Sequence, residues 1–127
     1  NKTNGLEQEV TLFDNVPYDQ MWEIYHVSDY YVNMNYTEIF GMAIMEAVYY
    51  CTSVAAVQAI GPSVTLKDMK GHCLCADDAA VARWLLAPYP AREDLEESAA
   101  KIARDFSWRR CAGAFLDIVK QKGGRMQ

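Results

Sequence analysis

The least polar part of the chain lies in its first half, where the pattern of apolar residues predicts a strand, a helix and a second strand. Residues 30–33 are predicted as a short strand, and from residue 39 to residue 66 only Glu46 carries a formal charge. Within that segment, residues 42–50 are predicted as a helix buried on most sides and residues 54–57 as a buried strand. A strand, a helix and a strand at this spacing form a βαβ unit, whose strands are parallel.

The remaining pattern predicts further short elements on both sides of this unit. Strands are expected at residues 10–13 and 72–75, and helices at residues 19–27, 64–68, 78–86 and 93–104, followed by a last helix that Ser107 caps. The last two helices each carry an apolar stripe that we expect to pack in the core. In the last helix this stripe comprises Trp108, Cys111, Ala112, Phe115, Ile118 and Val119. Residues 123–127 are expected to form a loose tail.

Strands that alternate with helices predict an α/β fold, a Rossmann-like parallel sheet with flanking helices. Ligands of such sheets bind beyond the carboxyl ends of the strands. Two predicted loops, residues 34–41 and 59–63, lie at that edge and define the candidate site.

Within the first of these loops, two residues suggest specific chemistry. Gly41 stands where the helix begins, and the free N–H groups of a first helical turn, approached closely over a glycine, suit an anion such as phosphate. Glu46, one turn further on, could accept hydrogen bonds from a diol such as that of ribose. The alternative is that Glu46 simply lies on the solvated stripe of its helix.

Length and charge narrow the class of protein. The 127 residues suit one domain, and the net charge of −5 argues against binding nucleic acid through a basic surface. No apolar run approaches the about 20 residues that span a bilayer, and the polar N-terminus has no signal-peptide pattern. We therefore expect a cytoplasmic protein, or one that is peripheral at a membrane as part of a larger parent.

The four cysteines do not form a metal-binding pattern. Cys73 and Cys75 form a C-x-C sequence rather than the C-x-x-C of a zinc ribbon, and on a strand both would lie on one face. Together with Cys51 and Cys111 they are predicted to be buried free thiols. Because neither histidine has a metal-ligand partner at a recognisable spacing, we expect no metal and no cofactor.

Residues 38–46, Glu-Ile-Phe-Gly-Met-Ala-Ile-Met-Glu, resemble the Glu–seven residues–Glu motif of the retaining nucleotide-sugar glycosyltransferases of family four, the group 1 type. The family pattern is roughly Glu-Gly-Phe-Gly, four residues, Glu-Ala, from which only Ile39 departs. Phe106-Ser107-Trp108 is similar to the closing signature of the family, and the resemblance extends from about residue 10 to residue 119.

The resemblance implies two Rossmann-like domains of the GT-B type, of which residues 1–127 would be a single partial unit, the later part of the C-terminal, nucleotide-sugar-binding domain. It implies that Glu46 binds the ribose, that Glu38 lies beside the donor sugar as the catalytic candidate, and that the remaining contacts come from Phe40, Gly41, Met42 and Gly61. The implied reaction transfers a hexose from a nucleoside-diphosphate sugar to a hydroxyl with retention. The acceptor, a glycan, lipid or small molecule as in polysaccharide biosynthesis, would be held by an N-terminal domain absent from this chain.

Departures from the family pattern leave other functions open. Cys51-Thr52-Ser53 replaces a usual Gly-Thr-Pro, Gly61 alone represents a loop that commonly has two glycines, and the usual basic phosphate ligands have no counterpart. We therefore expect little activity from this chain alone, and keep as alternatives a non-catalytic nucleotide-binding module and a generic flavodoxin-like domain with a flavin.

The earliest strands of the family domain also have no counterpart, which leaves residues 10–13 without their usual neighbour. This strand would pair directly with residues 30–33, or be displaced, or leave an open edge through which the chain associates with another chain.

Overall fold

The computed structural model describes residues 5–125, in which three parallel strands form one sheet. The strands are β1 (Tyr30–Asn33), β2 (Ser53–Val57) and β3 (Cys73–Cys75), in the order β1-β2-β3. Every residue of β2 is buried, as expected for a central strand covered on both faces. The predicted α/β, Rossmann-like sheet and its βαβ unit are confirmed.

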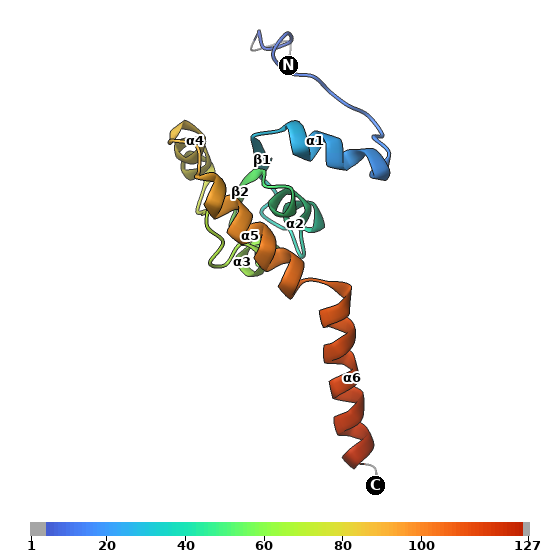
Figure 1. The fold of residues 1–127 in the computed structure, drawn as a ribbon. Helices are drawn as coiled ribbons and strands as arrows, with labels where there is room; N and C mark the ends of the chain where they lie inside the picture. The colour runs from blue at the N-terminus through green and yellow to red at the C-terminus, as the bar shows by residue number, and fades with distance from the viewer. Residues whose placement is uncertain (1–4, 126–127) are drawn as a thin grey trace.

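Helices cover both faces of the sheet, and the last one leaves the body of the molecule (Figure 1). They are the 3₁₀ turn η2 (Tyr18–Gln20) and α1 (Met21–Val27), α2 (Met42–Tyr49), α3 (Ile60–Thr65), α4 (Asp78–Leu86), α5 (Arg92–Asp105) and α6 (Trp108–Arg125). Two helix starts follow from their capping residues. Asp77 accepts a hydrogen bond from the Ala80 N–H at 2.9 Å, and the Ser107 hydroxyl accepts one from the Arg110 N–H at 3.2 Å.

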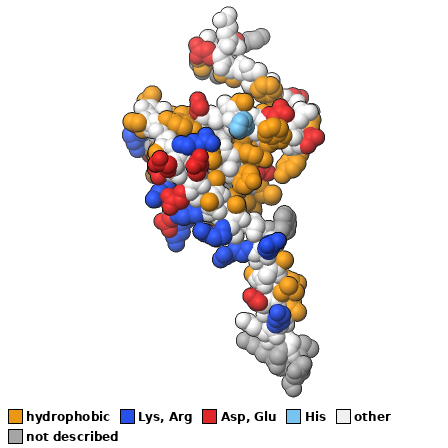
Figure 2. Space-filling model, in the orientation of Figure 1, with side chains coloured by type: hydrophobic (Ala, Val, Ile, Leu, Met, Phe, Trp, Pro, Cys, Tyr) orange, Lys and Arg blue, Asp and Glu red, His pale blue; other side chains and the backbone are white. Residues whose placement is uncertain are grey.

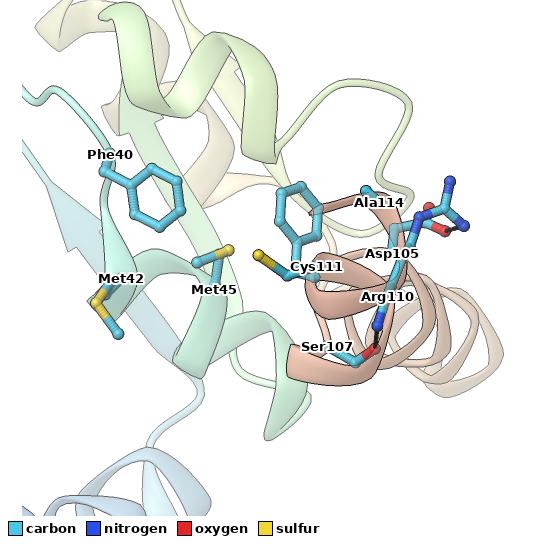
Figure 3. Close-up of a pocket in the computed structure, with 9 residues that line it drawn as sticks. Phe40, Met42, Met45, Asp105, Ser107, Arg110, Cys111 and Ala114 are labelled. Carbon is cyan, nitrogen blue, oxygen red and sulfur yellow. Dashed lines mark hydrogen bonds and ion pairs between the residues drawn. The ribbon is translucent and has the colours of Figure 1, made fainter. Parts of the chain in front are cut away.

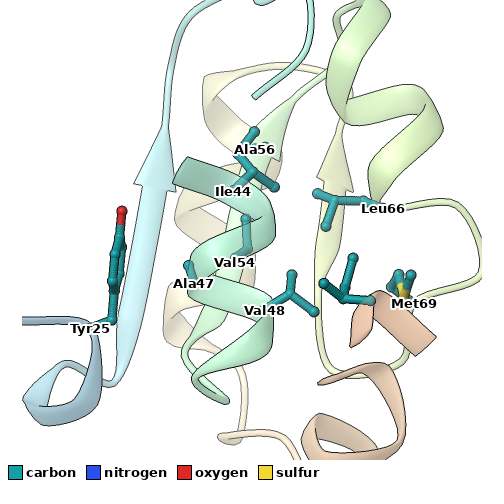
Figure 4. Close-up of a cluster of buried hydrophobic side chains, with 9 residues drawn as sticks. Tyr25, Ile44, Ala47, Val48, Val54, Ala56, Leu66 and Met69 are labelled. Atoms are coloured by element: carbon teal, nitrogen blue, oxygen red, sulfur yellow. The ribbon is translucent and has the colours of Figure 1, made fainter. Parts of the chain in front are cut away.

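The core has two parts, one on each face of β2. Val54 and Ala56 face α2 and α5, and Ala55 and Val57 face α4, because side chains alternate along a strand. Figure 4 shows the larger part gathered between α2, β2 and the segment after α3. Its buried members are Tyr25, Ile44, Ala47, Val48, Val54, Ala56, Leu66, Met69 and Ile102. The apolar run around Glu46 therefore forms the centre of the fold.

The prediction of a strand at residues 10–13 is wrong. These residues belong to no strand, and their apolar side chains are exposed, Leu12 to 91 %. The N-terminal segment stands off the body, so the structure corresponds to the displaced arrangement (Figure 1). The segment makes no ladder hydrogen bonds to the outer edge of β1, which is unpaired in the described sheet. A short apolar segment without such hydrogen bonds gains too little to offset the entropy cost of its ordering.

The prediction that the stripe on the last helix packs in the core is also wrong. α6 projects from the body, and Phe115, Ile118 and Val119 are exposed, Phe115 to 65 %, as are Cys111 and Ala112. The side chain of Trp108 lies outside the described residues. Residues 123–125 do not form the predicted loose tail, because α6 continues to Arg125. Residues 126 and 127 lie outside the described residues.

The predicted loop at residues 59–63 is mostly helical. α3 begins at Ile60, so the predicted helix at residues 64–68 starts and ends too late. Pro62 does not interrupt α3 because it lies in the first turn, where backbone N–H groups need no partner within the helix. Only the short connection before Ile60 is left as a loop between β2 and α3.

Candidate functional site

The loop between β1 and α2 is held at the carboxyl edge of the sheet by side-chain hydrogen bonds. The Asn35 amide oxygen accepts from the Thr37 N–H at 3.0 Å and from the Thr37 hydroxyl at 2.8 Å. The Glu38 carboxylate accepts from the Asn33 amide at 3.3 Å and from the Asn35 amide at 3.5 Å. Glu38 is therefore fixed beside the end of β1, half-buried, by residues that the sequence analysis did not single out.

Gly41 opens α2 in a conformation that favours glycine. Its φ of 79° and ψ of 56° are left-handed, and a Cβ at this position would lie 3.0 Å from the Ile44 side chain. The Gly41 carbonyl accepts from the N–H groups of Ile44 and Met45, at 3.1 and 3.2 Å. The N–H groups at the start of a helix have no carbonyl partner within it, so the first turn of α2 is a candidate position for an anion.

Gly61 lies directly against this loop. A Cβ on Gly61 would come within 2.7 Å of the carbonyl carbon and oxygen of Phe40, and the Gly61 N–H donates to the Glu38 carbonyl at 3.0 Å. The two segments that the sequence placed at the same edge of the sheet are thus brought together. Gly61 covers one side of the Phe40 backbone, and the absence of a side chain on Gly61 lets the loop and α3 pack this closely.

Glu46 is held by two tyrosines that are distant in sequence. The Tyr18 hydroxyl donates to one carboxylate oxygen at 3.3 Å, and the Tyr25 hydroxyl donates to the other at 3.1 Å. Burial, and then the hydrogen bond to Glu46, raise the pKa of the Tyr25 phenol. Because each carboxylate oxygen has two lone pairs, each keeps one for a further donor. Glu46 is half-buried and partnered, which differs from a carboxylate on a freely solvated stripe.

Tyr31 connects the two glutamates electrostatically. Its pKa is raised by burial, by the charge of Glu38 and also by the charge of Glu46, so both carboxylates act on the same hydroxyl. Sequence reasoning missed the tyrosines altogether. The available signal was their distribution, because seven of the eight tyrosines lie between Tyr18 and Tyr50.

Two hollows flank Glu46, one on each side. The hollow on the α1 side has a volume of about 170 Å³ and is lined largely by aromatic rings, those of Tyr18, Trp22, Tyr25 and Tyr50. The hollow on the α5 side has about 220 Å³ and is lined by Met42, Met45, Tyr49, Tyr50, Ile102 and Phe106. Glu46 and Tyr50 line both hollows.

A larger groove of about 560 Å³ lies between the start of α2 and the start of α6 (Figure 3). Phe40, Met42 and Met45 line it on one side, and Phe106, Cys111 and Ala114 line it on the other. Figure 3 shows Phe40, Met45 and Cys111 facing this space, with Asp105, Ser107 and Arg110 at its α6 side. The side chains of Phe40 and Met42 therefore line an apolar groove. Their backbone atoms belong to the loop and the helix start beside the two glutamates.

Other classes of site find no support in the part of the chain that the structure describes. Residues 5–125 contain no group of three or more His, Cys, Asp or Glu side chains arranged to hold a metal ion. The four cysteines are free thiols, of which only Cys75 is buried. No helix in the described range is both long and apolar enough to cross a membrane.

A known protein family matches most of the chain. The family model described as glycosyl transferases group 1 matches residues 2–105 of this chain. No curated protein matches the sequence significantly. The matched range contains every candidate residue at the edge of the sheet, Glu38, Gly41, Glu46 and Gly61 among them, and it ends where α5 ends, before α6 begins.

Proposed function

This chain belongs to the group 1 glycosyltransferases, and from that membership we propose that residues 33–46 bind the nucleoside-diphosphate part of a sugar donor. The observation that carries the proposal is the arrangement at the start of α2. A first helical turn opened by left-handed Gly41 lies beside two carboxylates that are each held separately by hydrogen bonds. All three features stand at the carboxyl edge of a parallel sheet, where ligands of such sheets bind.

The diphosphate would lie at the first turn of α2. Backbone N–H groups there point out of the helix, and the helix dipole favours negative charge at this end. In glycosyl transfer the charge that develops on the leaving diphosphate is the main feature to be stabilised, and fixed N–H donors do this without reorganising. Gly41 supplies the left-handed conformation that opens this turn, and Gly61 packs against the Phe40 backbone that precedes it.

The ribose and base would lie beside Glu46. One lone pair on each Glu46 oxygen is left for the two hydroxyls of a diol, because Tyr18 and Tyr25 take the others. The aromatic hollow of about 170 Å³ on the α1 side adjoins the same carboxylate and offers ring faces on which a base would stack. Glu38, fixed at the other end of the loop by Asn33, would face the hydroxyls of the donor sugar.

The reaction would replace the nucleoside diphosphate by an acceptor hydroxyl with retention at the anomeric carbon. Residues 1–127 would supply the donor-binding half of this chemistry as a single partial domain, with the acceptor held elsewhere in a larger protein. We therefore expect the chain to bind nucleoside diphosphates and to transfer no sugar by itself.

Calorimetric titration of UDP and GDP into this chain tests the proposal. We expect one of them to bind, and Glu46→Gln to weaken that binding at least about tenfold, because a charge-assisted pair of hydrogen bonds to the ribose is worth more than about 1.4 kcal/mol. Glu23→Gln, an exposed position on α1, is the matched control and should leave the affinity unchanged. Equal affinities in the Glu46→Gln and Glu23→Gln variants would contradict the role of Glu46.

The second candidate is a nucleotide-binding module without catalysis. It is favoured by the start of α3 at Ile60, which turns most of the expected glycine-containing loop into helix. Both candidates predict nucleotide binding, so only transfer distinguishes them. The test uses a full-length parent protein and a panel of acceptors. If that protein binds the nucleotide but neither hydrolyses the sugar donor nor transfers its sugar to any acceptor, the result would favour a nucleotide-binding module without catalysis.

A further inference from the structure

Strand β3 brings two thiols into contact at a place that the donor site does not use. Cys73 and Cys75 lie two positions apart on the strand, so their side chains share the face that packs against Val81 and Trp84 of α4. The distance between their Sγ atoms is 2.7 Å. This is well inside the roughly 4 Å at which side-chain atoms ordinarily touch, and a disulfide bond would bring them to about 2.05 Å.

The two thiols differ in accessibility. Cys75 is 1 % exposed and belongs to the core on the α4 side, whereas Cys73 is only half-buried at its edge. Burial, followed by the hydrogen bond to Cys73, raises the pKa of the Cys75 thiol to about 12, so Cys75 stays protonated at neutral pH. A reagent from solution therefore reaches the Cys73 sulfur first, while the Cys75 sulfur is buried next to it and close enough to form a bond with it.

We propose that Cys73 and Cys75 form a redox-active dithiol, which closes to an intrachain disulfide on reaction with a low-molecular-weight disulfide such as oxidised glutathione. The Cys73 thiolate attacks one sulfur of the small disulfide, forming a mixed disulfide on Cys73 and releasing one small thiolate. Cys75 then loses its proton and attacks the Cys73 sulfur, which releases the second small thiol. In sum, two protein thiols and one small disulfide give one protein disulfide and two small thiols.

Strand geometry makes this bond reversible. Residues two positions apart on an extended strand point the same way, so their Cβ atoms are separated by about the rise of two residues, roughly 6.6 Å. The Cβ atoms of a disulfide lie only about 3.5–4.5 Å apart, so the backbone of β3 must bend when the bond closes. A strained disulfide is readily reduced again. Within the described sheet β3 pairs only with β2 and has three residues, so it can deform without disturbing the β1–β2 pairing. This dithiol site does not depend on the proposed donor site.

The test is to incubate the native chain with oxidised glutathione, alkylate the thiols that are left, and analyse tryptic peptides by mass spectrometry. Lys70 and Arg83 are successive cleavage sites, so one peptide, residues 71–83, contains both cysteines. We expect this peptide to lose the mass of two hydrogen atoms and to escape alkylation, and dithiothreitol to restore both thiols. Exposed Cys111 on α6 serves as an internal control, because it should form a mixed disulfide under the same conditions.

Single variants test the order of the two steps. Cys75→Ser should stop at a mixed disulfide on Cys73, and Cys73→Ser should leave Cys75 unmodified because Cys75 is buried. The proposal is overturned if peptide 71–83 of the unmutated native chain keeps two alkylatable thiols while Cys111 has reacted with glutathione. It is also overturned if Cys75 of a folded Cys73→Ser variant reacts as fast as Cys111.

Discussion

Strand β2 and helix α6 both carry apolar side chains at the spacing of their secondary structure, but only those of β2 are buried. All five residues of β2 are buried, whereas the described members of the α6 stripe, from Cys111 to Val119, are exposed (Figure 2). The difference lies in their neighbours. β2 has a strand on each side and helices on both faces, while α6 meets the body only near its first turns, at the groove beside Phe40. Amphipathic spacing thus specifies which face of an element needs a partner, without specifying that a partner is present.

The comparison predicts that equivalent apolar truncations have very different costs in the two regions. Ile44→Ala removes a side chain that is fully buried between α2 and β2, and we expect it to lower the free energy of unfolding by about 2–5 kcal/mol. Phe115→Ala on α6 is the matched control, and its effect should stay below about 0.5 kcal/mol because its ring is largely exposed. Urea unfolding followed by circular dichroism measures both, and equal losses would show that α6 packs on the body in solution.

Acid should lower the stability of the fold through His72, whose half-buried side chain lies beside the start of β2. Burial lowers the pKa of His72 from 6.5 to about 4, and its Nδ1 atom accepts a hydrogen bond from the Val54 N–H at 2.9 Å. The folded state therefore binds fewer protons than the unfolded state between these values. The stabilisation is complete above pH 6.5 and is lost as the pH falls towards 4, by about 3 kcal/mol in all.

His72→Asn tests this pH dependence, because the amide keeps an acceptor for the Val54 N–H and does not titrate. We expect the unfolding free energy of the variant to fall less than that of the unmutated chain between pH 7 and pH 4.5, whatever its value at pH 7. Parallel curves for the two proteins would mean that His72 is not held neutral by the fold.

Adding a methyl group to a glycine should also have different effects in the two regions. Gly61→Ala would place a Cβ within 2.7 Å of the Phe40 backbone, so we expect a loss of about 1–3 kcal/mol and a displaced site loop. Gly113→Ala on α6 meets nothing within 4 Å and should raise helix content without lowering stability. Thermal unfolding and far-ultraviolet circular dichroism report the two effects, and a Gly61→Ala variant as stable as the parent chain would mean that α3 does not press on this loop.

The parts of the fold that the sequence predicted are those with local signals. The uninterrupted apolar run of β2, the capping residue Ser107 and the glycine at the start of α2 each act over a few residues, and the structure confirms the elements they predict. Residues 10–13 and the α6 stripe have equally clear local patterns. They were predicted wrongly because burial depends on a partner, and local periodicity carries no information about one.

The same limit applies to the candidate site. The sequence located Glu38, Gly41 and Glu46 on one loop and helix, because they lie close together in the chain, and it placed Gly61 at the same edge through the order of strands in a parallel sheet. It did not reveal that Tyr18 and Tyr25 hold Glu46, because these residues precede it by 28 and 21 positions and reach it only after α1 packs on α2. The roles of Glu38, Gly41 and Glu46 in donor binding are predictions that the nucleotide titration tests.

The smallest expected effect comes from removing most of α6. A chain that ends at Ala114 keeps the turns that line the groove and loses Phe115, Ile118 and Val119, which are all exposed. Because these side chains touch little of the body, the unfolding free energy should change by less than about 0.5 kcal/mol. The truncated chain should also keep the near-ultraviolet spectrum that the tyrosines around Glu46 produce. A loss above about 1 kcal/mol, or a change in that spectrum, would show that the far half of α6 folds back on the body, and that its apolar stripe is buried much as the stripe pattern first predicted.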